Sequence, residues 1–393
     1  MATPEPTTLP MISRLIGFDT TSRNSNLELI EFVRDYLADL GVDSHLVYDG
    51  AGRKANLFAT LGPTDRPGIC LSGHTDVVPV DDQDWHTDPF QAVRGDGRLY
   101  GRGTADMKSF LGVCLGLAPE LLQRELATPI HFAFTYDEEV GCVGVRPLID
   151  WLSRQRIRPR SCVVGEPTGM RPVRAHKGKQ GVRCHVRGLA CHSAVLDRGV
   201  NAVEAAAEVI TYLKSMARRF RAQGPFDTGF EPSYTSVHTG TVQGGTALNI
   251  VPEHCVFEFE FRYLPSEDPE ALIDEVRRYA EEQVLPEMRE VCGDAGFTWQ
   301  TLSEFAGLET DAHAEIVHLV GALTENAEAG KVSFGTEAGL YQRAGMPSVV
   351  CGPGSIEQAH KPDEFIELEQ IARCETFVRR LGERLSAAQS IRR

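Results

Sequence analysis

The sequence lacks long apolar runs and an excess of basic residues. None of its apolar stretches approaches the ~18–20 residues that a membrane-spanning helix needs, so we expect no membrane partner. Its 40 lysines and arginines are outnumbered by 55 aspartates and glutamates, which gives a formal net charge of −15. Because nucleic acids and anionic lipid surfaces select basic proteins, this charge argues against both as partners.

The sequence also lacks paired cysteines. Its ten cysteines form no C-x-x-C pair, and several lie in apolar runs such as "SCVVGE". Cysteine in such runs behaves as a small buried hydrophobe, which favours reduced thiols over a disulfide framework or a zinc finger. The first twenty residues show no basic stretch followed by an apolar run, so we expect no secretory signal. These features together predict a cytoplasmic protein.

What is present is a chain of 393 residues, longer than the roughly 100–200 residues that one domain usually needs. Short apolar segments in its first part, "GICLSG", "IHFAFTYD" and "SCVVGE", have the length of strands. They alternate with helix-like stretches such as "LELIEFVRDYLADLG". Strands that are apolar on both faces and alternate with helices predict an α/β domain with a largely parallel sheet.

The pattern changes after "AHKGKQG". Polar and apolar residues alternate in "GVRCHVRG", and a long helix, two paired strands and the helix "EALIDEVRRYAEEQVL" follow. This β-α-β-β-α-β order predicts an α+β domain with one antiparallel sheet and two helices. The first pattern returns near residue 300. We therefore expect residues 1–180 and 300–393 to form the α/β domain, with residues 181–299 inserted as the α+β domain.

Charged residues follow the apolar strands of the first domain. In an open α/β sheet, ligands bind outside the carboxyl ends of the strands, so these residues are expected to converge on one crevice. Each motif alone is equally consistent with a polar loop, a solvated face or a turn. Their repetition after several strands is what predicts a site. The residues are His74, Asp76, Asp106, Glu138, Glu139, Glu166 and His360.

Two histidines and several carboxylates suit Zn²⁺, Co²⁺ or Mn²⁺. With one histidine per ion and one shared carboxylate, the set predicts two ions about 3.5–4 Å apart that activate a bridging water and polarise a carbonyl. Residues two apart on a strand point to the same side. Asp76 is therefore expected to bond the far imidazole nitrogen of His74 and fix its tautomer.

The motifs "SGHTDVVP", "LYGRGTADMKS", "YDEEVG", "VVGEPT" and "AHKPDE" resemble the M20 family of dinuclear metallo-hydrolases and occur in that family's order. "CHSAVLDRGVNAVEAA" and "GGTALNIVP" in the insert match as well. The resemblance implies a metallopeptidase-like catalytic domain and an insert that serves as a lid or dimerisation domain in a homodimer. It also implies two Zn²⁺ per subunit, with Co²⁺ as an alternative.

The resemblance implies a role for each matching position. One metal ion is bound by His74 and Glu166, the other by Glu139 and His360, and Asp106 bridges them. The implied catalytic residues are Glu138 as general base, Asp76 as the residue that orients His74, and His192 as the oxyanion donor. The implied substrate-binding residues are Asn249 and Arg262, and Glu337 in "FGTEAGLYQ" is a further candidate that the resemblance does not supply. Glu337 either pairs with a substrate ammonium group or is a structural turn residue.

Within the family, "AHKGK", "SFGTEAGLYQ" and "CGPGSIEQAHKPDEFI" look like the acetylornithine deacetylases. This resemblance implies a small N-acyl amino acid as substrate, namely N-acetyl-L-ornithine, and a place in arginine biosynthesis. Sister enzymes are the alternatives: another N-acyl-amino-acid deacylase, a succinyl-diaminopimelate desuccinylase or a glutamate carboxypeptidase. A non-catalytic member that binds only metal or an amino acid is disfavoured, because Glu138 and all five metal positions are intact.

Overall fold

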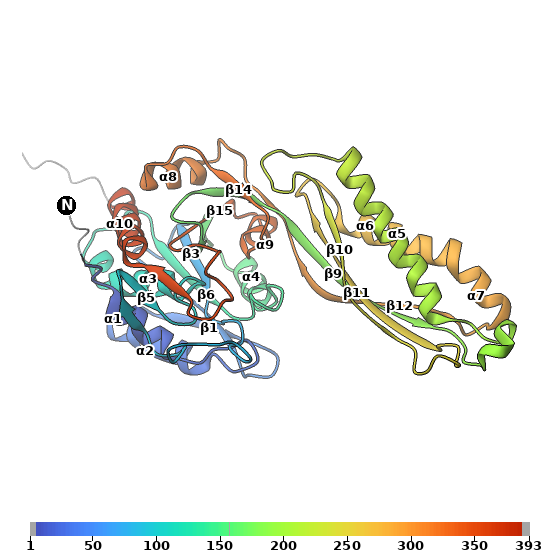
Figure 1. Cartoon of the computed structure of the whole chain (residues 1–393). Coiled ribbons are helices and arrows are strands. Elements are labelled where there is room, and N and C mark those ends of the chain that lie inside the picture. The colour runs from blue at the N-terminus through green and yellow to red at the C-terminus, as the bar shows by residue number, and fades with distance from the viewer. Residues whose placement is uncertain (1–4, 157, 387–393) are drawn as a thin grey trace, which may run out of the picture. The chain divides into compact units, whose positions relative to one another are not determined.

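The computed structural model describes residues 5–156 and 158–386, which form two compact units (Figure 1). Unit 1 comprises Met1–Ala175, Leu308–Gly330 and Thr336–Arg393. Unit 2 comprises His176–Gly307 and the short return segment Lys331–Gly335. Unit 2 therefore begins before residue 181 and continues beyond residue 299.

A mixed sheet forms the centre of unit 1, in the strand order β1-β2-β6-β3-β7-β15-β8-β13, with β14 paired to β8. Four neighbouring strands at its middle, β6, β3, β7 and β15, run parallel, and every residue in them is buried. Burial on both faces is what parallel strands between helices require. The bounds are β1 Ser44–Tyr48, β2 Ala55–Leu61, β3 Ile69–His74, β6 Ile130–Thr135, β7 Ser161–Pro167, β8 Val173–His176, β13 Leu308–Glu309, β14 Gly330–Val332 and β15 Ser348–Gly352.

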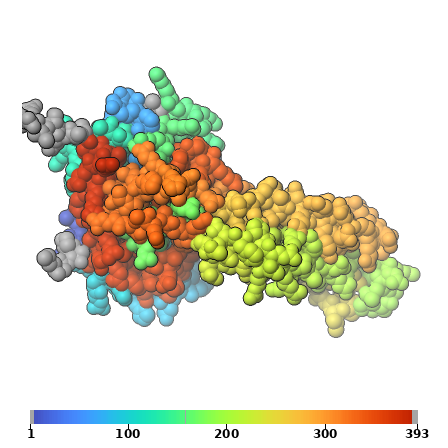
Figure 2. Space-filling view, turned by 90° about the horizontal axis from the view of Figure 1, so that it is seen from above, coloured from blue at the N-terminus to red at the C-terminus, as the bar shows by residue number. Residues whose placement is uncertain are grey.

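Helices from all three stretches of unit 1 share its apolar core. In α2, buried residues at helical spacing (Leu29, Ile30, Val33 and Leu37) face that core. Figure 2 shows segments of unit 1 from its early and late stretches lying side by side. The helices are α1 Leu9–Ile16, α2 Leu27–Asp39, α3 Lys108–Leu122, α4 Val145–Ser153, α8 Glu315–Thr324, α9 Ala338–Arg343 and α10 Leu368–Leu385. A small sheet has the order β16-β5-β4, from β4 Val93–Gly95, β5 Arg98–Tyr100 and β16 Phe365–Glu367.

Unit 2 is an antiparallel sheet in the order β10-β11-β9-β12, with helices along one face (Figure 1). Burial alternates along β11, because only the face under the helices is covered. This arrangement and the parallel centre of unit 1 confirm the predicted fold class. The bounds are β9 Gly178–Arg187, β10 Ser236–Gly244, β11 His254–Tyr263, β12 Gly296–Phe305, α5 Ala202–Gln223, α6 Pro269–Tyr279 and α7 Leu285–Val291. Two short helical segments are the 3₁₀ turn η1 Ser193–Arg198 and the π turn η2 Ala280–Val284.

The helix predicted over "EALIDEVRRYAEEQVL" is not uniform. It begins as α6, passes through the π turn η2, and continues as α7, which has Pro286 in its first turn. Proline lacks a backbone N–H, and its ring clashes with the carbonyl four residues earlier, so the α-helical ladder is interrupted there. No helix in the described part of the chain is long and apolar enough to cross a membrane.

Candidate metal centre

The carboxyl ends of the parallel strands in unit 1 bring the predicted metal ligands together. His74 is the last residue of β3, and Glu166 lies at the end of β7. Glu139 follows β6, Asp106 precedes α3, and His360 follows β15. Because β6, β3, β7 and β15 are neighbours in that order, their carboxyl ends lie along one edge of the sheet.

Asp106 lies between the two histidines. Its Oδ1 is 2.9 Å from Nε2 of His74, and its Oδ2 is 3.4 Å from Nε2 of His360. Nε2 of His74 is also 3.7 Å from Oε1 of Glu166, while Nε2 of His360 is 3.1 Å from Oε2 of Glu139. The five predicted ligands thus form one cluster in which Asp106 is central.

Asp76 anchors more than the imidazole that it was expected to orient. The nearest partner of His74 Nδ1 is the backbone carbonyl of Asp76, at 2.8 Å, and the carboxylate Oδ1 is 3.5 Å away. The Asp76 carboxylate accepts hydrogen bonds from the backbone N–H groups of Glu138 (3.1 Å) and Glu139 (3.3 Å), and from the Ser22 hydroxyl (2.7 Å). One carboxylate therefore positions both His74 and the segment that carries Glu138 and Glu139.

The basic and acidic groups of the cluster perturb one another. Burial alone favours neutral His74, but hydrogen bonds to Asp106 and Asp76 raise its pKa well above 6.5. Contacts with Asp106 and Glu139 raise the pKa of His360 to about 10. Burial would raise the pKa of Asp106, yet the hydrogen bonds from His360 and His74 hold it below its usual 3.8. The site therefore stabilises positive charge at the two imidazoles.

The remaining carboxylates are crowded. Burial, with the nearby charge of Asp106, raises the pKa of Glu139 to about 7 and raises the pKa of Glu166 well above 4.5. Burial and the charge of Glu139 also raise the pKa of Glu138, to well above 4.5. Such a cluster is neutralised either by protons or by cations. The mutual repulsion of these buried carboxylates favours binding of a cation among them.

The donor set fits divalent cations. Three ligand atoms from His74, Asp106 and Glu139 lie within 4.8 Å of one another, and so do three from His74, Glu138 and Glu166. Oε1 of Glu139 is buried and accepts no hydrogen bond from any described residue, so it is available to a ligand. Imidazole nitrogen and carboxylate oxygen are the donors that Zn²⁺ takes in proteins. The residues present therefore fit one or two such ions.

Cys142 contacts Glu138, a contact that the sequence did not reveal. The buried Cys142 lies with its Sγ 3.4 Å from Oε1 of Glu138, in the geometry of a thiol that donates to a carboxylate. Nothing in "YDEEVGCVG" marks this cysteine, because a buried thiol is ordinarily a packing residue. Glu138 is thus held through its backbone by Asp76 and through its side chain by Cys142.

Glu337 is buried near the same edge of the sheet. Glu337 is 1% exposed, and neither of its carboxylate oxygens accepts a hydrogen bond from a described residue. The Thr135 hydroxyl lies close enough to lower the pKa of Glu337, but it donates its hydrogen bond to the Gly73 carbonyl, at 3.3 Å. Burial dominates and raises the pKa of Glu337 to about 7, against the opposing charge of His74.

The other predicted site residues belong to unit 2. His192 is exposed at the start of η1, where its Nδ1 accepts from the backbone N–H of Ala194 at 3.1 Å. Asn249 lies beside it, since its carbonyl accepts from the Ser193 N–H at 3.1 Å. Arg262 lies on β11 and donates from Nε to Oε1 of Glu260 at 3.0 Å. Unit 2 therefore brings His192 and Asn249 together, with Arg262 on a separate element.

Two residues that were not predicted support the Asp106 loop. Glu364 is 1% exposed, and its carboxylate accepts from the N–H groups of Gly103, Ala105 and Asp106 at 2.8–3.0 Å. The equally buried Arg102 donates to it at 2.7 Å. The only available signal was their presence in the motifs "GRGTADMKS" and "AHKPDE". An acidic residue two positions after Pro362 otherwise looks like part of a solvated turn.

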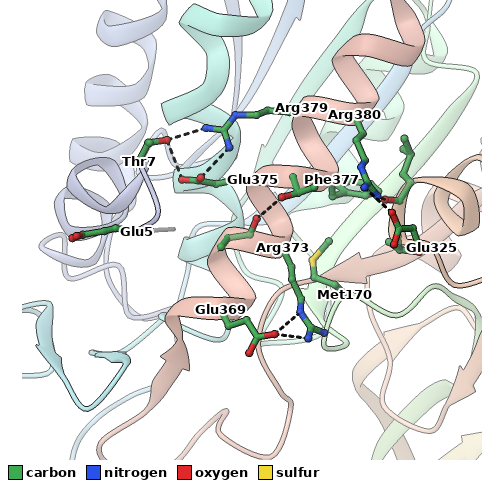
Figure 3. Close-up of a pocket in the computed structure, with 14 residues that line it drawn as sticks. Glu5, Thr7, Met170, Glu325, Glu369, Arg373, Glu375, Phe377, Arg379 and Arg380 are labelled. Carbon is green, nitrogen blue, oxygen red and sulfur yellow. Dashed lines mark hydrogen bonds and ion pairs between the residues drawn. The ribbon is translucent and has the colours of Figure 1, made fainter. Parts of the chain in front are cut away.

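A cavity of about 590 Å³ lies elsewhere in unit 1, beside α10, the end of α8 and the N-terminal residues Glu5 and Thr7 (Figure 3). None of the residues that line it belongs to the metal-ligand cluster. Its arginines pair with acidic neighbours, as Figure 3 shows for Arg373–Glu369, Arg379–Glu375 and Arg380–Glu325. The cavity therefore presents little unpaired charge to a ligand.

Known proteins resemble this chain along most of its length. Residues 70–384 match peptidase family M20/M25/M40. An acetylornithine deacetylase from Pasteurella multocida is 34% identical over 93% of this chain and 94% of its own. An aminopeptidase from Bacillus cereus has a similar structure, with a TM-score of 0.74, 23% identity and coverage of 96% and 98% of the two chains. A Bacillus subtilis protein described as a dinuclear metal binding peptidase of the M20 family also has a similar structure. Its TM-score is 0.67 and its sequence identity is 15%, with coverage of 96% of this chain and 97% of its own.

Proposed function

The chain belongs to peptidase family M20/M25/M40 and is a hydrolase, and from that premise we propose that it removes the acetyl group from N-acetyl-L-ornithine. The products are acetate and the L-ornithine used in arginine biosynthesis. The observation that carries the proposal is the convergence of two histidines and four carboxylates at one sheet edge. The name of the Pasteurella multocida relative supports the choice of substrate.

The proposed metal site holds two zinc ions per chain. His74 and Glu166 would hold one ion, Glu139 and His360 would hold the other, and Asp106 would be shared between them, a role that its central position supports. Cobalt accepts the same donors. When bound, the ions supply a water of lowered pKa and polarise the carbonyl of the substrate. The Bacillus subtilis family member is described as a dinuclear metal binding peptidase, which supports the choice of two ions.

Glu138 is the proposed general base. It takes a proton from the attacking water as the new bond from oxygen to the acetyl carbon forms. It then returns the proton to the α-nitrogen of ornithine as the C–N bond breaks, so that acetate and the free amine leave. A carboxyl whose pKa lies above its usual range holds a proton between these two steps more readily than an ordinary one. The backbone bond to Asp76 supports this role by fixing where Glu138 lies.

Unit 2 is proposed to supply the substrate contacts and to serve as a lid or dimerisation domain. His192 donates to the oxyanion, Asn249 binds the substrate, and Arg262 binds the α-carboxylate through a two-pronged ion pair. The proximity of His192 and Asn249 supports a shared role for them. Arg262 has Glu260 as its present partner, so binding requires it to exchange one carboxylate for another.

A homodimer formed through unit 2 is part of the proposal. Large apolar side chains are exposed on the edge strand β10, on the loop after it and on η1. Exposed apolar groups on and near an edge strand are typical of a protein interface. They are Val242, Leu248, Ile250, Val195 and Leu196, and Leu248 is fully exposed. The proposed partner is a second copy, whose His192 completes the site, and Leu248→Glu should convert dimer to monomer in analytical ultracentrifugation.

Glu337 is the proposed partner of the δ-ammonium of the substrate. Both of its oxygens lack hydrogen bonds from described residues, so an arriving cation has an unsatisfied carboxyl group to meet. Because the residue is 1% exposed, such binding requires the start of α9 to open. Glu337→Gln should lose the preference for cationic over neutral side chains, measured as the ratio of kcat/KM for N-acetylornithine and N-acetylmethionine. An unchanged ratio would assign Glu337 to the structure of the turn.

The cytoplasm is the proposed location. All ten cysteines are free, and eight of them are buried. Reduced thiols in this number are typical of a reducing compartment.

The deciding experiment is amine release from N-acetyl-L-ornithine by metal-stripped protein, before and after addition of Zn²⁺ or Co²⁺. Release that depends on metal would support both the site and the substrate. Metal binding with release only from N-acetylmethionine or N-succinyl-diaminopimelate would move the chain to a sister deacylase. Absence of stoichiometric metal binding would refute the proposed site.

A further inference from the structure

The two histidines of the proposed metal site are held in different ways. The His74 side chain is 1% exposed at the end of a buried strand, and its Nδ1 lies 2.8 Å from the Asp76 carbonyl. The His360 side chain is 54% exposed, on a loop where the residue has a φ of 65°. Among residues 5–156 and 158–386, no group makes a hydrogen bond to Nδ1 of His360. Apart from the contacts of its Nε2 with Asp106 and Glu139, the position of the ring therefore depends on how the His360 backbone is held.

Gln83 holds that backbone from a distant part of the chain. Its Nε2 donates to the carbonyl of His360 at 3.1 Å. Its Oε1 accepts from Nη2 of Arg102 at 2.5 Å and from Nε1 of Trp85 at 3.0 Å. Only one orientation of the amide satisfies all three contacts, because arginine and indole nitrogens donate and a carbonyl accepts.

Arg102 continues the connection to the other side of the cluster. Its Nη1 donates to Oε2 of Glu364 at 2.7 Å and to the carbonyl of Lys361 at 3.3 Å. Glu364 in turn accepts from the backbone N–H of Asp106 at 3.0 Å. A continuous hydrogen-bonded path therefore runs from the backbone of Asp106 through Glu364, Arg102 and Gln83 to the backbone of His360.

We propose that Gln83 is a positioning residue for the metal ion bound by Glu139 and His360, acting through the hydrogen bond between its amide and the His360 carbonyl. The proposal rests on the dinuclear site of the proposed function. Groups that orient a metal ligand commonly change metal affinity by about ten- to a hundredfold when removed. The His74 side of the site has its own anchor in Asp76, so the effect is confined to one ion.

The amide of Gln83 permits a sharp substitution. Gln83→Glu keeps the oxygen that accepts from Arg102 and Trp85, but replaces the donor to His360 by an oxygen that repels the carbonyl. Gln83→Ala removes all three contacts. If Gln83→Ala fails to fold, as judged by circular dichroism, the result for Gln83→Glu decides.

The test is zinc binding to the metal-stripped full chain, by titration calorimetry for affinity and by dialysis with elemental analysis for stoichiometry. Wild type should bind two ions per chain. Both Gln83 variants should keep the affinity for one ion and bind the other about ten- to a hundredfold more weakly. Unchanged affinity for both ions, or equal weakening of both, would overturn the proposal. A wild-type chain that binds fewer than two ions would overturn the dinuclear site itself, and this inference with it.

Two controls separate positioning from general damage to the loop. Gln91→Ala alters an exposed glutamine a few residues downstream and should leave both affinities unchanged. His360→Ala should weaken the same ion, and adding Gln83→Ala to it should cause no further loss, because both changes act through one ligand. Weakening in the Gln91 variant, or losses that add in the double variant, would show that Gln83 does not act through His360.

Discussion

The two sheets of this chain use their faces in opposite ways. In unit 1, every residue of β3, β6 and β7 is buried, and charged groups gather at the carboxyl ends of these strands. In unit 2, β11 alternates between covered and more open positions, and its more open side carries Glu258, Glu260 and Arg262. When helices cover both faces of a sheet, the strand ends are where its polar side chains can meet solvent and ligands.

The charges of the two units differ accordingly. On unit 2, Arg183 pairs with Glu258 at 2.6 Å, and Lys179 and Arg262 share Glu260, all on a partly solvated face. Ion pairs of this kind contribute about 0–1 kcal/mol each. At the carboxyl ends of the parallel strands in unit 1, the charges of the ligand cluster are largely buried together, and their pKa values are displaced in both directions. Concentrated, buried charge is a property of this sheet edge and not of the protein as a whole.

The largest expected contrast is in catalysis. Glu138→Gln should lower kcat by about 10²–10⁴-fold, because the variant can neither accept nor return the proton. Steady-state amine release from N-acetyl-L-ornithine measures the effect. The matched change on the other sheet, Glu258→Gln, should leave kcat unaltered. If Glu138→Gln also loses a metal ion by elemental analysis, Glu138 is a ligand and the assignment of the base is wrong.

The second contrast is in stability. Phe132 is fully buried in β6 and stacks with Phe134, so Phe132→Ala should lower the free energy of unfolding of unit 1 by about 3–5 kcal/mol. Thr301→Ala, at an exposed position of β12, should change stability by less than about 0.5 kcal/mol. Urea unfolding followed by circular dichroism compares them. Similar losses of unfolding free energy in the two variants would mean that the buried position in β6 and the exposed position in β12 do not differ in their contribution to stability.

The third effect concerns pH. Burial lowers the pKa of His131 from 6.5 to about 4, so the unfolded chain binds more protons between these values. The contribution of His131 to the free energy of unfolding is therefore fully present above pH 6.5. About 3 kcal/mol of it is lost as the pH falls towards 4. In His131→Phe, the difference in unfolding free energy between pH 7 and pH 4 should shrink by that amount. An equal pH dependence in variant and wild type would exclude His131 as its source.

The smallest effect belongs to the open sheet. Arg183→Ala breaks a partly exposed pair with Glu258 and should cost less than about 1 kcal/mol. The loss should shrink further at 1 M salt, because screening weakens such pairs. Chemical unfolding at low and high ionic strength measures both. A loss of several kcal/mol would mean that unit 2 also depends on its charges.

Much of this contrast was readable from the sequence. Apolar runs followed by His74, Glu139 or Glu166 predicted both the buried strands and the edge where the ligands meet. The fold class and the family resemblance are confirmed. These features depend on periodicity and order along the chain, which a sequence displays directly.

The sequence did not reveal which polar residues support the ligands. Asp363 and Glu364 are neighbours in one motif, yet Asp363 pairs with the exposed His86 while Glu364 is buried against three backbone N–H groups. Gln83 lies in a stretch that looks like an ordinary acidic loop. Such roles depend on contacts between residues more than 250 positions apart, which local pattern does not encode.

The strand order of unit 1 has a consequence for synthesis. β15 lies between β7 and β8, although it follows β7 in the chain only after the whole of His176–Gly307. At ribosomal rates, the interval between these two strands is on the order of ten to forty seconds. During that interval β7 has an unpaired edge, the kind of surface that recruits other nascent chains. His360 emerges later still, so the proposed metal site is among the last features that a newly made chain can complete.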